Sequence, residues 1–262
     1  MSSTGHIKLR HIVPSVVTVF SICAGLTSVR MSLEGHLEVA LYFILLAVFL
    51  DAADGKVARY LDSASPFGAE LDTLADFFNF GIVPGLLLYN TLYVGTAHSS
   101  LGWLASLVLA VCCALRLARF NLSLKTSTVP LKQDDHFVGV PAPALACLAL
   151  MPVFMHLYGW QNTDLPVLRA IYIIGVGLLA VSTIPTFSIK HAKIRRAHLP
   201  FVIVCAVVLV VCLMVYPWPT LIAANCLYLL SLPVSFLLYQ RRAKAVIAAQ
   251  QSGSDTGNDA AP

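Results

Sequence analysis

The chain has 262 residues, of which 11% are charged and 58% are hydrophobic, and its formal net charge is +4. A soluble globular domain has about 25% charged residues, and a protein of this size cannot bury so much apolar surface in its own interior. The composition therefore excludes an ordinary soluble enzyme, a disordered chain and a collagen-like chain. It favours an all-α, polytopic membrane protein, because the apolar runs are long and continuous, unlike the short alternating segments of a transmembrane β-barrel.

Eight apolar segments have about the length, near 20 residues, that spans the hydrocarbon core as a helix. We predict helices over 12–31, 36–59, 69–94, 101–121, 139–158, 166–187, 199–216 and 219–240. The tight break at Pro217 to Pro219 predicts that the last two helices are antiparallel neighbours. Residues 12–240 are thus expected to form one transmembrane domain, between an N-terminal segment 1–11 and a polar tail 241–262 that we predict to be disordered.

The basic residues predict the orientation of the chain in the membrane. Fifteen of the 17 Lys and Arg residues lie before the first helix or around the breaks after the second, fourth, sixth and eighth helices. Arg30 and Arg169 are the two that would lie on the opposite side of the membrane. The positive-inside rule therefore predicts that both termini are cytoplasmic, in an inner or plasma membrane. Because the basic residues do not gather on one exposed face, no nucleic-acid partner is expected.

The acidic residues are concentrated in one part of the chain, since six of the 13 lie between positions 51 and 76. Four of these lie in apolar, helix-forming sequence: Asp51, Asp54, Asp72 and Asp76. Asp51 and Asp54 lie on one face of the second predicted helix, and Asp72 and Asp76 lie on one face of the third. The break from Leu61 to Pro66 allows these two helices to fold side by side. Like charges so close together do not all stay ionised without a cation between them. Carboxylate oxygens are suitable ligands for Mg²⁺ or Mn²⁺, and a pair of such ions can catalyse phosphoryl transfer.

The residues between the aspartates are suited to a bulky, phosphorylated ligand. Gly55, Ala58 and Gly68 leave space close to the backbone. Arg59 carries a guanidinium that can bind two phosphate oxygens at once. The same four aspartates would also fit a structural carboxylate network or a pathway for cations.

The pattern Asp51-x2-Asp54-Gly55-x2-Ala58-Arg59-x8-Gly68-x3-Asp72-x3-Asp76 resembles the complete signature of the CDP-alcohol phosphotransferase family. The resemblance implies an integral membrane enzyme with a six-helix core, a cytoplasm-facing site and, by analogy, a homodimeric state. It also implies that the four aspartates bind two divalent metal ions, Mg²⁺ or Mn²⁺, and that Asp76 is the general base. The residues implied in binding CDP are Asp54, Gly55, Ala58, Arg59 and Gly68.

Further segments, at 67–76, 80–84, 116–121 and 139–143, resemble the bacterial and archaeal phosphatidylserine synthase branch of that family. This resemblance implies transfer of the phosphatidyl group from CDP-diacylglycerol to the hydroxyl of L-serine, giving phosphatidylserine and CMP. The candidates for binding the acceptor are Arg116, Arg119 and Asn121. Three positions depart from what the branch usually has: Ser15 and Ser21 replace Asn, and Asn79 replaces Ser.

Two other functions are compatible with these residues. A sister enzyme would use the same chemistry with glycerol 3-phosphate, inositol phosphate or choline as its acceptor. A cation transporter would use the four aspartates as its pathway, although such a function does not explain Arg59 or the small residues beside the aspartates.

Overall fold

The computed structural model describes residues 13–61, 63, 65–126, 136–138, 140–160, 165–182, 185–187 and 199–233. These residues are almost entirely helical, which confirms the predicted all-α class. The helices are α1 (Val13–Leu33), α2 (Leu37–Tyr60), α3 (Pro66–Phe77), the π-helical η2 (Phe78–Ile82), α4 (Val83–Leu92), α5 (Ser99–Thr126), α6 (Ala142–Ala149), α7 (Met151–Leu157), α8 (Pro166–Val181) and α9 (Leu199–Val215). Residues 217–233 are also helical. The strands β1 (His136–Val138) and β2 (Pro185–Phe187) form a short antiparallel pair.

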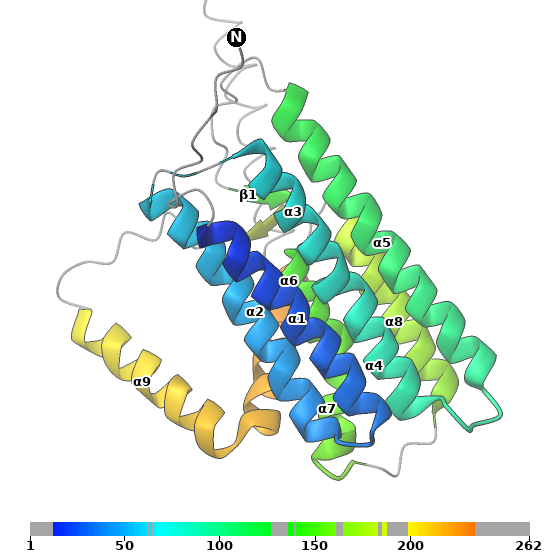
Figure 1. Ribbon diagram of the computed structural model, residues 1–262. Coiled ribbons are helices and arrows are strands. Elements are labelled where there is room, and N and C mark those ends of the chain that lie inside the picture. Colours follow the sequence, from blue (N-terminus) through cyan, green and yellow to red (C-terminus); the bar gives the residue numbers. More distant parts are fainter. Residues whose placement is uncertain are drawn as a thin grey trace, which may run out of the picture.

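The first six helical segments of the described chain form a bundle (Figure 1). They are α1, α2, the continuous run α3–η2–α4, α5, the pair α6–α7, and α8. Successive segments run in opposite directions, so the end of α2 and the beginning of α3 lie at the same end of the bundle (Figure 1). This is the end at which the four aspartates were expected to meet.

The turn between α1 and α2 has a local cause in the sequence. Gly35 adopts a φ of +83°, a left-handed conformation that costs little without a Cβ atom. The hairpin is then held by the hydroxyl of Ser28, which donates to the carbonyl of Ala40 at 2.6 Å. In a membrane such hydrogen bonds and close packing of small residues hold helices together, because lipid supplies no hydrophobic driving force between them.

The beginning of α3 is fixed by Ser65 and Pro66. The Ser65 side chain accepts a hydrogen bond from the Gly68 N–H at 3.0 Å, which satisfies a donor that the helix itself cannot use. Pro66 occupies the first turn, where its missing N–H costs nothing and its fixed φ favours the helix. The helix therefore begins three residues before the predicted start at position 69.

The π-helical turn η2 lies just before Pro84. Proline has no N–H to donate to the carbonyl four residues earlier, and the Val83 N–H bonds to the carbonyl of Phe78, five residues back. The local widening of the helix lets the chain pass the proline without a break. It also places Asn79, Phe80 and Gly81 in the buried interior of the bundle.

The helix 217–233 packs on the six-segment bundle, whereas α9 stands apart from it (Figure 1). Trp218 is buried and contacts the rings of Tyr42 on α2 and Phe154 on α7, with centroid distances of 5.4 and 6.1 Å. Asn225 donates to the carbonyl of Cys147 on α6 at 2.9 Å. The last described helix is therefore attached to the core at two points.

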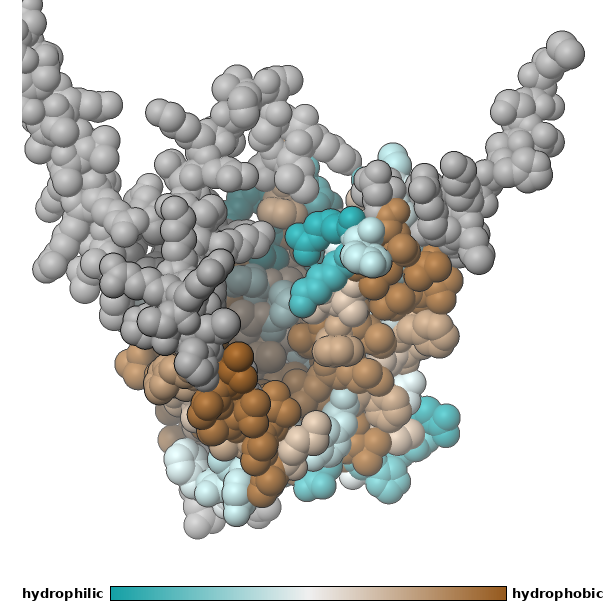
Figure 2. All heavy atoms as spheres, turned by 90° about the vertical axis from the view of Figure 1, so that its left-hand side faces the viewer, coloured by the Kyte–Doolittle hydropathy of each residue, from teal (hydrophilic) through white to brown (hydrophobic). Residues whose placement is uncertain are grey.

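The surface of the bundle is that of a membrane protein. Many large apolar side chains are exposed on α1, α5, α8 and α9. On the face seen in Figure 2, hydrophobic residues occupy the middle, and hydrophilic residues lie toward the upper and lower ends. In the part of the chain that is described, three helices are both long and apolar enough to cross a bilayer: Val13–Leu33, Pro66–Leu92 and Ser99–Leu122.

All eight predicted segments contain helix, but two of them differ in detail. The predicted helix 139–158 divides into α6 and α7 at Leu150, because Pro152 has no N–H to continue the hydrogen-bond ladder. The predicted helix 166–187 ends at Val181, before the strand β2 that begins with Pro185. The segment 1–11, the tail 241–262 and the end of the eighth predicted helix lie outside the described residues.

Candidate functional site

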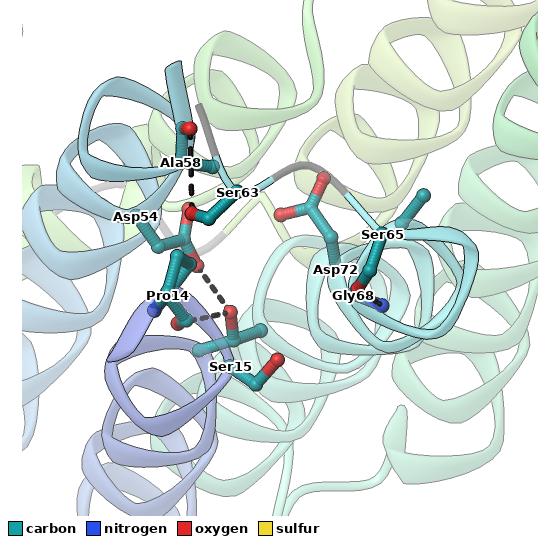
Figure 3. Close-up of a pocket in the computed structure, with 11 residues that line it drawn as sticks. Pro14, Ser15, Asp54, Ala58, Ser63, Ser65, Gly68 and Asp72 are labelled. Carbon is teal, nitrogen blue, oxygen red and sulfur yellow. Dashed lines mark hydrogen bonds between the residues drawn. The ribbon is translucent and has the colours of Figure 1, made fainter. Parts of the chain in front are cut away.

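The four aspartates of the cluster meet at one end of the bundle. Asp51 and Asp54 lie on the last turns of α2, and Asp72 and Asp76 lie on α3. The carboxyl groups of Asp51 and Asp76 are within hydrogen-bonding reach of each other. Asp54 and Asp72 point toward the same space from the two helices (Figure 3). The two helices therefore bring both aspartate pairs to the same end of the bundle, although only Asp54 and Asp72 line the cavity found there.

The helix α1 supports this cluster through Thr18, which the sequence analysis did not single out. The Thr18 hydroxyl lies 2.7 Å from Oδ2 of Asp54 and 3.0 Å from the carbonyl of Pro14. Both Thr18 and Asp54 are buried. A hydroxyl has one proton to donate, and the charge of a carboxylate makes it the stronger acceptor. Thr18 therefore fixes one oxygen of Asp54, Oδ2.

Two oxygens of the cluster are buried without a hydrogen-bond partner among the described residues, Oδ1 of Asp51 and Oδ1 of Asp54. Buried polar atoms are almost always satisfied, so unpartnered carboxylate oxygens indicate that a positive ligand belongs there. An oxygen-only donor set fits a hard divalent cation such as Mg²⁺ or Mn²⁺. As they stand, no three His, Cys, Asp or Glu side chains of the described chain are close enough together to hold a metal ion. The carboxylates are gathered, but they are not in ligand geometry.

A cavity of about 150 Å³ opens beside the cluster (Figure 3). Its walls come from the beginning of α1, the end of α2, the connecting segment and the beginning of α3. The lining residues are Pro14, Ser15, Thr18, Asp54, Gly55, Ala58, Ser63, Ser65, Gly68, Ala69 and Asp72. Small and hydroxyl-bearing residues predominate, so the wall offers hydrogen-bonding groups together with close access to the backbone.

The two glycines of the cavity have different surroundings. A Cβ atom added to Gly55 would meet no atom within 4 Å, so this position leaves open space at the cavity wall. A Cβ atom added to Gly68 would lie 3.1 Å from Oγ of Ser65, the same oxygen that caps α3. Gly55 thus leaves space for a ligand, whereas Gly68 preserves the beginning of a helix.

Arg59 is exposed and does not line the cavity. Its Nε donates to the carbonyl of Gly55, one turn earlier on α2, at 3.1 Å. The guanidinium therefore lies along the helix next to a residue that does line the cavity. It is near the predicted CDP site, but in this structure it does not extend into it.

The three candidate acceptor residues on α5 have different partners. Arg116 donates from Nε to the carbonyl of Val140 and is within electrostatic range of Asp76. Arg119 donates to the carbonyls of Val181 and Ser182 at 2.6 and 3.3 Å. It therefore satisfies the end of α8, as cations at helix C-termini do.

The third candidate, Asn121, donates to the hydroxyl of Thr73 at 3.1 Å and joins α5 to α3. Within the described part of the chain, the hydrogen bonds of Arg119 and Asn121 go to α8 and α3 and not to an aspartate of the cluster. Of the three, Arg116 is thus the residue that lies within electrostatic range of a carboxylate of the cluster.

Comparisons with known proteins show what this chain is similar to. A family model described as CDP-alcohol phosphatidyltransferase matches residues 11–181, a range that includes the six-segment bundle and all four aspartates. The chain is 36% identical over 222 residues to a Mycobacterium tuberculosis protein named CDP-diacylglycerol–serine O-phosphatidyltransferase, covering 82% of this chain and 76% of that protein. Proteins of the same name from Helicobacter pylori and Bacillus subtilis are each 33% identical, over 184 and 183 residues. These matches cover 70% and 69% of this chain, and 75% and 93% of the two relatives.

Proposed function

We propose that this chain, which belongs to the CDP-alcohol phosphatidyltransferase family, transfers the phosphatidyl group of CDP-diacylglycerol to the hydroxyl of L-serine. The products are phosphatidylserine and CMP. The observation that carries the proposal is the meeting of four aspartates, two of them with unpartnered buried oxygens, beside a cavity walled by small residues. The similarity to proteins named for the serine reaction supports serine as the acceptor.

The donor lies with its diphosphate at the aspartates and its nucleotide toward the cavity. The open space at Gly55 and the small side chain of Ala58 let the ligand approach α2 closely. Gly68 holds the opposite wall in place, and Arg59 stands at the edge, where its guanidinium can turn onto a phosphate. The acyl chains remain in the surrounding lipid, because the bundle is apolar on its outer surface.

The reaction is a direct displacement at phosphorus. Asp76 accepts the proton of the serine hydroxyl, and the serine oxygen forms a bond to the phosphorus that carries diacylglycerol. The bond from that phosphorus to the bridging oxygen breaks, and CMP leaves with the electron pair. Two divalent ions, Mg²⁺ or Mn²⁺, would be held by Asp51, Asp54, Asp72 and Asp76, and would neutralise the charge of the diphosphate and of the leaving CMP. The protein supplies mainly positioning and charge stabilisation, which phosphoryl transfer requires.

Arg116 is the residue of α5 that binds the acceptor. Its position next to Asp76 would place a carboxylate of the acceptor close to the hydroxyl that loses its proton. Arg119 and Asn121 act on the protein itself, since their donors are engaged with α8 and α3. They keep α5 in register with α8 and α3.

The same proposal includes the placement of the enzyme. The site and both termini face the cytoplasm, and residues 12–240 form the transmembrane catalytic domain. Lys56, Arg59, Arg116 and Arg119 lie toward the end of the bundle that carries the aspartates, whereas Arg30 lies at the end of α1. This distribution supports a cytoplasmic site under the positive-inside rule. A homodimer is expected from the family resemblance.

The test is an assay of purified protein with CDP-diacylglycerol, Mg²⁺ or Mn²⁺ and labelled L-serine. We expect CMP release and labelled phosphatidylserine in equal amounts. Glycerol 3-phosphate, inositol phosphate and choline, offered in parallel, identify the acceptor, and turnover with one of them in place of serine would overturn the serine assignment. Metal flux in liposomes without CMP release would indicate a transporter instead.

A second arm of the assay tests the general base. Asp76→Asn should abolish CMP release while the protein stays folded. The matched control is Glu38→Gln, which removes an exposed acidic group at the opposite end of α2 and should leave turnover unchanged. Normal turnover in Asp76→Asn would falsify the assignment of the base.

A further inference from the structure

Tyr228 carries a buried polar group that the reaction described above does not use. It lies on the helix 217–233, beyond the residues 11–181 that match the family model. Its hydroxyl oxygen is buried and has no hydrogen-bond partner among the described residues. The phenol is within electrostatic range of Arg116 on α5. A helix outside the range of the family match thus carries a buried hydroxyl within electrostatic range of Arg116, which is itself within electrostatic range of Asp76.

The position of Tyr228 is fixed by contacts on both sides of it. Asn225 lies three residues earlier, on the same face of the helix, and donates to the carbonyl of Cys147 on α6. Leu232, one turn later, is buried in the core. Trp218, at the start of the helix, contacts Tyr42 and Phe154. This face is therefore held against the bundle, and with it the buried hydroxyl of Tyr228.

A buried hydroxyl without a partner is unfavourable unless a ligand completes it. Arg116 uses Nε on the carbonyl of Val140, and it makes no other hydrogen bond to a described residue. The terminal nitrogens of the Arg116 guanidinium and the hydroxyl of Tyr228 are all hydrogen-bond donors. Such a set matches a carboxylate, which only accepts hydrogen bonds and which a guanidinium can bind through two oxygens.

Arg116 is also within electrostatic range of Asp76, so the proposed carboxylate site and the proposed base lie in the same part of the bundle. In serine, the carboxylate and the hydroxymethyl group are both attached to the Cα atom, so the carboxylate and the hydroxyl lie close together. An acceptor of this kind can present its hydroxyl to Asp76 and its carboxylate to Arg116 and Tyr228 at the same time. Glycerol or choline has no carboxylate and would leave the Tyr228 hydroxyl unpartnered.

We infer that Tyr228, together with Arg116, binds the carboxylate of the acceptor and selects a hydroxy amino acid over other alcohols. The inference rests on the proposed transfer to serine. It assigns a role in specificity to the last described helix, which lies outside the family match.

The test compares Tyr228→Phe with the unmodified enzyme, using serine and serinol, which replaces the carboxylate of serine with a second hydroxymethyl group. Loss of a hydrogen bond to a charged group should raise the KM for serine roughly 10- to 100-fold. The KM for CDP-diacylglycerol and the rate with saturating serinol should stay within about twofold. The thermal stability of the free enzyme should be unchanged or higher, because Tyr228→Phe removes an unsatisfied buried group.

The matched control is Tyr172→Phe on α8, whose hydroxyl donates to the carbonyl of Leu148 at 2.9 Å. This change should lower thermal stability and leave the KM for serine unchanged, which is the opposite pattern. An unchanged serine KM in Tyr228→Phe, or an equal loss with serine and serinol, would overturn the inference.

A measurement on the unmodified enzyme keeps the inference testable if Tyr228→Phe does not fold. The enzyme must then prefer serine over serinol by at least about tenfold in kcat/KM, as expected for a buried site that binds a charged group. Equal use of the two alcohols would overturn the inference. If the unmodified enzyme releases no CMP with serine, the proposed function fails instead, so the two failures are distinct.

Discussion

The side-chain amide of Asn79 donates to the hydroxyl of Ser21 at 2.6 Å, and both residues are buried. The bond joins η2 to α1 near the middle of the bundle. These are two of the three positions at which the sequence departs from the phosphatidylserine synthase branch. That branch usually has Asn where this chain has Ser21, and Ser where this chain has Asn79. The two departures are therefore reciprocal, and in this chain the exchanged residues are hydrogen-bonded to each other.

The exchange predicts that changes at positions 21 and 79 do not affect stability independently. Ser21→Ala should cost about 1–2 kcal/mol of stability, because it leaves the amide of Asn79 unpaired in the interior. The reversed pair, Ser21→Asn with Asn79→Ser, should cost less than the sum of the two single changes, since the pair can form again. Thermal unfolding in detergent, with the four proteins compared as a double-mutant cycle, measures the coupling. Simple additivity would show that the two residues are independent.

The sequence predicted the helices and the aspartate cluster because both depend on short-range periodicity. Spacings of three and four residues place Asp51 beside Asp54 and Asp72 beside Asp76 on their own helices. The apolar runs, separated by glycine, proline and charged residues, likewise predicted most of the described helix ends to within a few residues, although α8 ends at Val181 and not at 187. The division of 139–158 by Pro152 and the π-helical turn before Pro84 were missed, since an apolar run with a proline also fits a continuous helix.

Contacts between helices could not be predicted from the same spacings. Thr18 supports Asp54 from a different helix and lies 36 positions earlier in the chain. No helical periodicity relates those two positions. Arg116 and Arg119 are one turn apart on α5 and look equivalent in the sequence, yet their guanidinium groups have different partners. Tyr228 lies on an apolar helix in which nothing marks one tyrosine as facing an arginine.

The bond from Thr18 to Asp54 predicts a defect in metal use. Thr18→Val removes the hydroxyl that fixes one oxygen of Asp54, and loss of such a supporting contact typically weakens metal affinity about 10- to 100-fold. We expect the Mg²⁺ or Mn²⁺ concentration for half-maximal CMP release to rise by that factor. Excess metal should largely restore the maximal rate.

The control for this change is Thr27→Val on the same helix. The Thr27 hydroxyl donates to the carbonyl of Cys23 at 2.7 Å and lies far along α1 from the aspartates. Its removal should leave the metal dependence unchanged. If Thr18→Val and Thr27→Val have the same metal dependence, Thr18 does not support the site.

The two cavity glycines predict two different kinds of defect. Gly55→Ala adds a methyl group where no protein atom lies within 4 Å, so stability should change little while the KM for CDP-diacylglycerol rises. Gly68→Ala places a methyl group 3.1 Å from the Ser65 oxygen that caps α3. It should therefore lower stability by about 1 kcal/mol, the usual value of an N-cap, as well as activity. Thermal unfolding and CDP-diacylglycerol kinetics separate the two, and a loss of stability in Gly55→Ala would contradict the open space seen there.

Arg116 and Arg119 provide the sharpest comparison, because they are the same residue type one turn apart on α5. Arg119→Gln removes the donors to the last carbonyls of α8, so it should lower stability by about 1–3 kcal/mol and leave the KM for serine unchanged. Arg116→Gln removes a cation within electrostatic range of Asp76 and should raise the KM for serine at least about tenfold, the cost of losing a hydrogen bond to a charged group.

Serine kinetics and thermal unfolding of both variants measure this difference. Serinol serves as the second acceptor, because it has no carboxylate for an arginine to bind. Arg116→Gln should therefore affect serine more than serinol, whereas Arg119→Gln should affect neither acceptor selectively. If Arg119→Gln instead raises the KM for serine without loss of stability, the contact with α8 is not its main role. The acceptor carboxylate then lies one turn farther along α5, closer to the end of the bundle and away from Asp76.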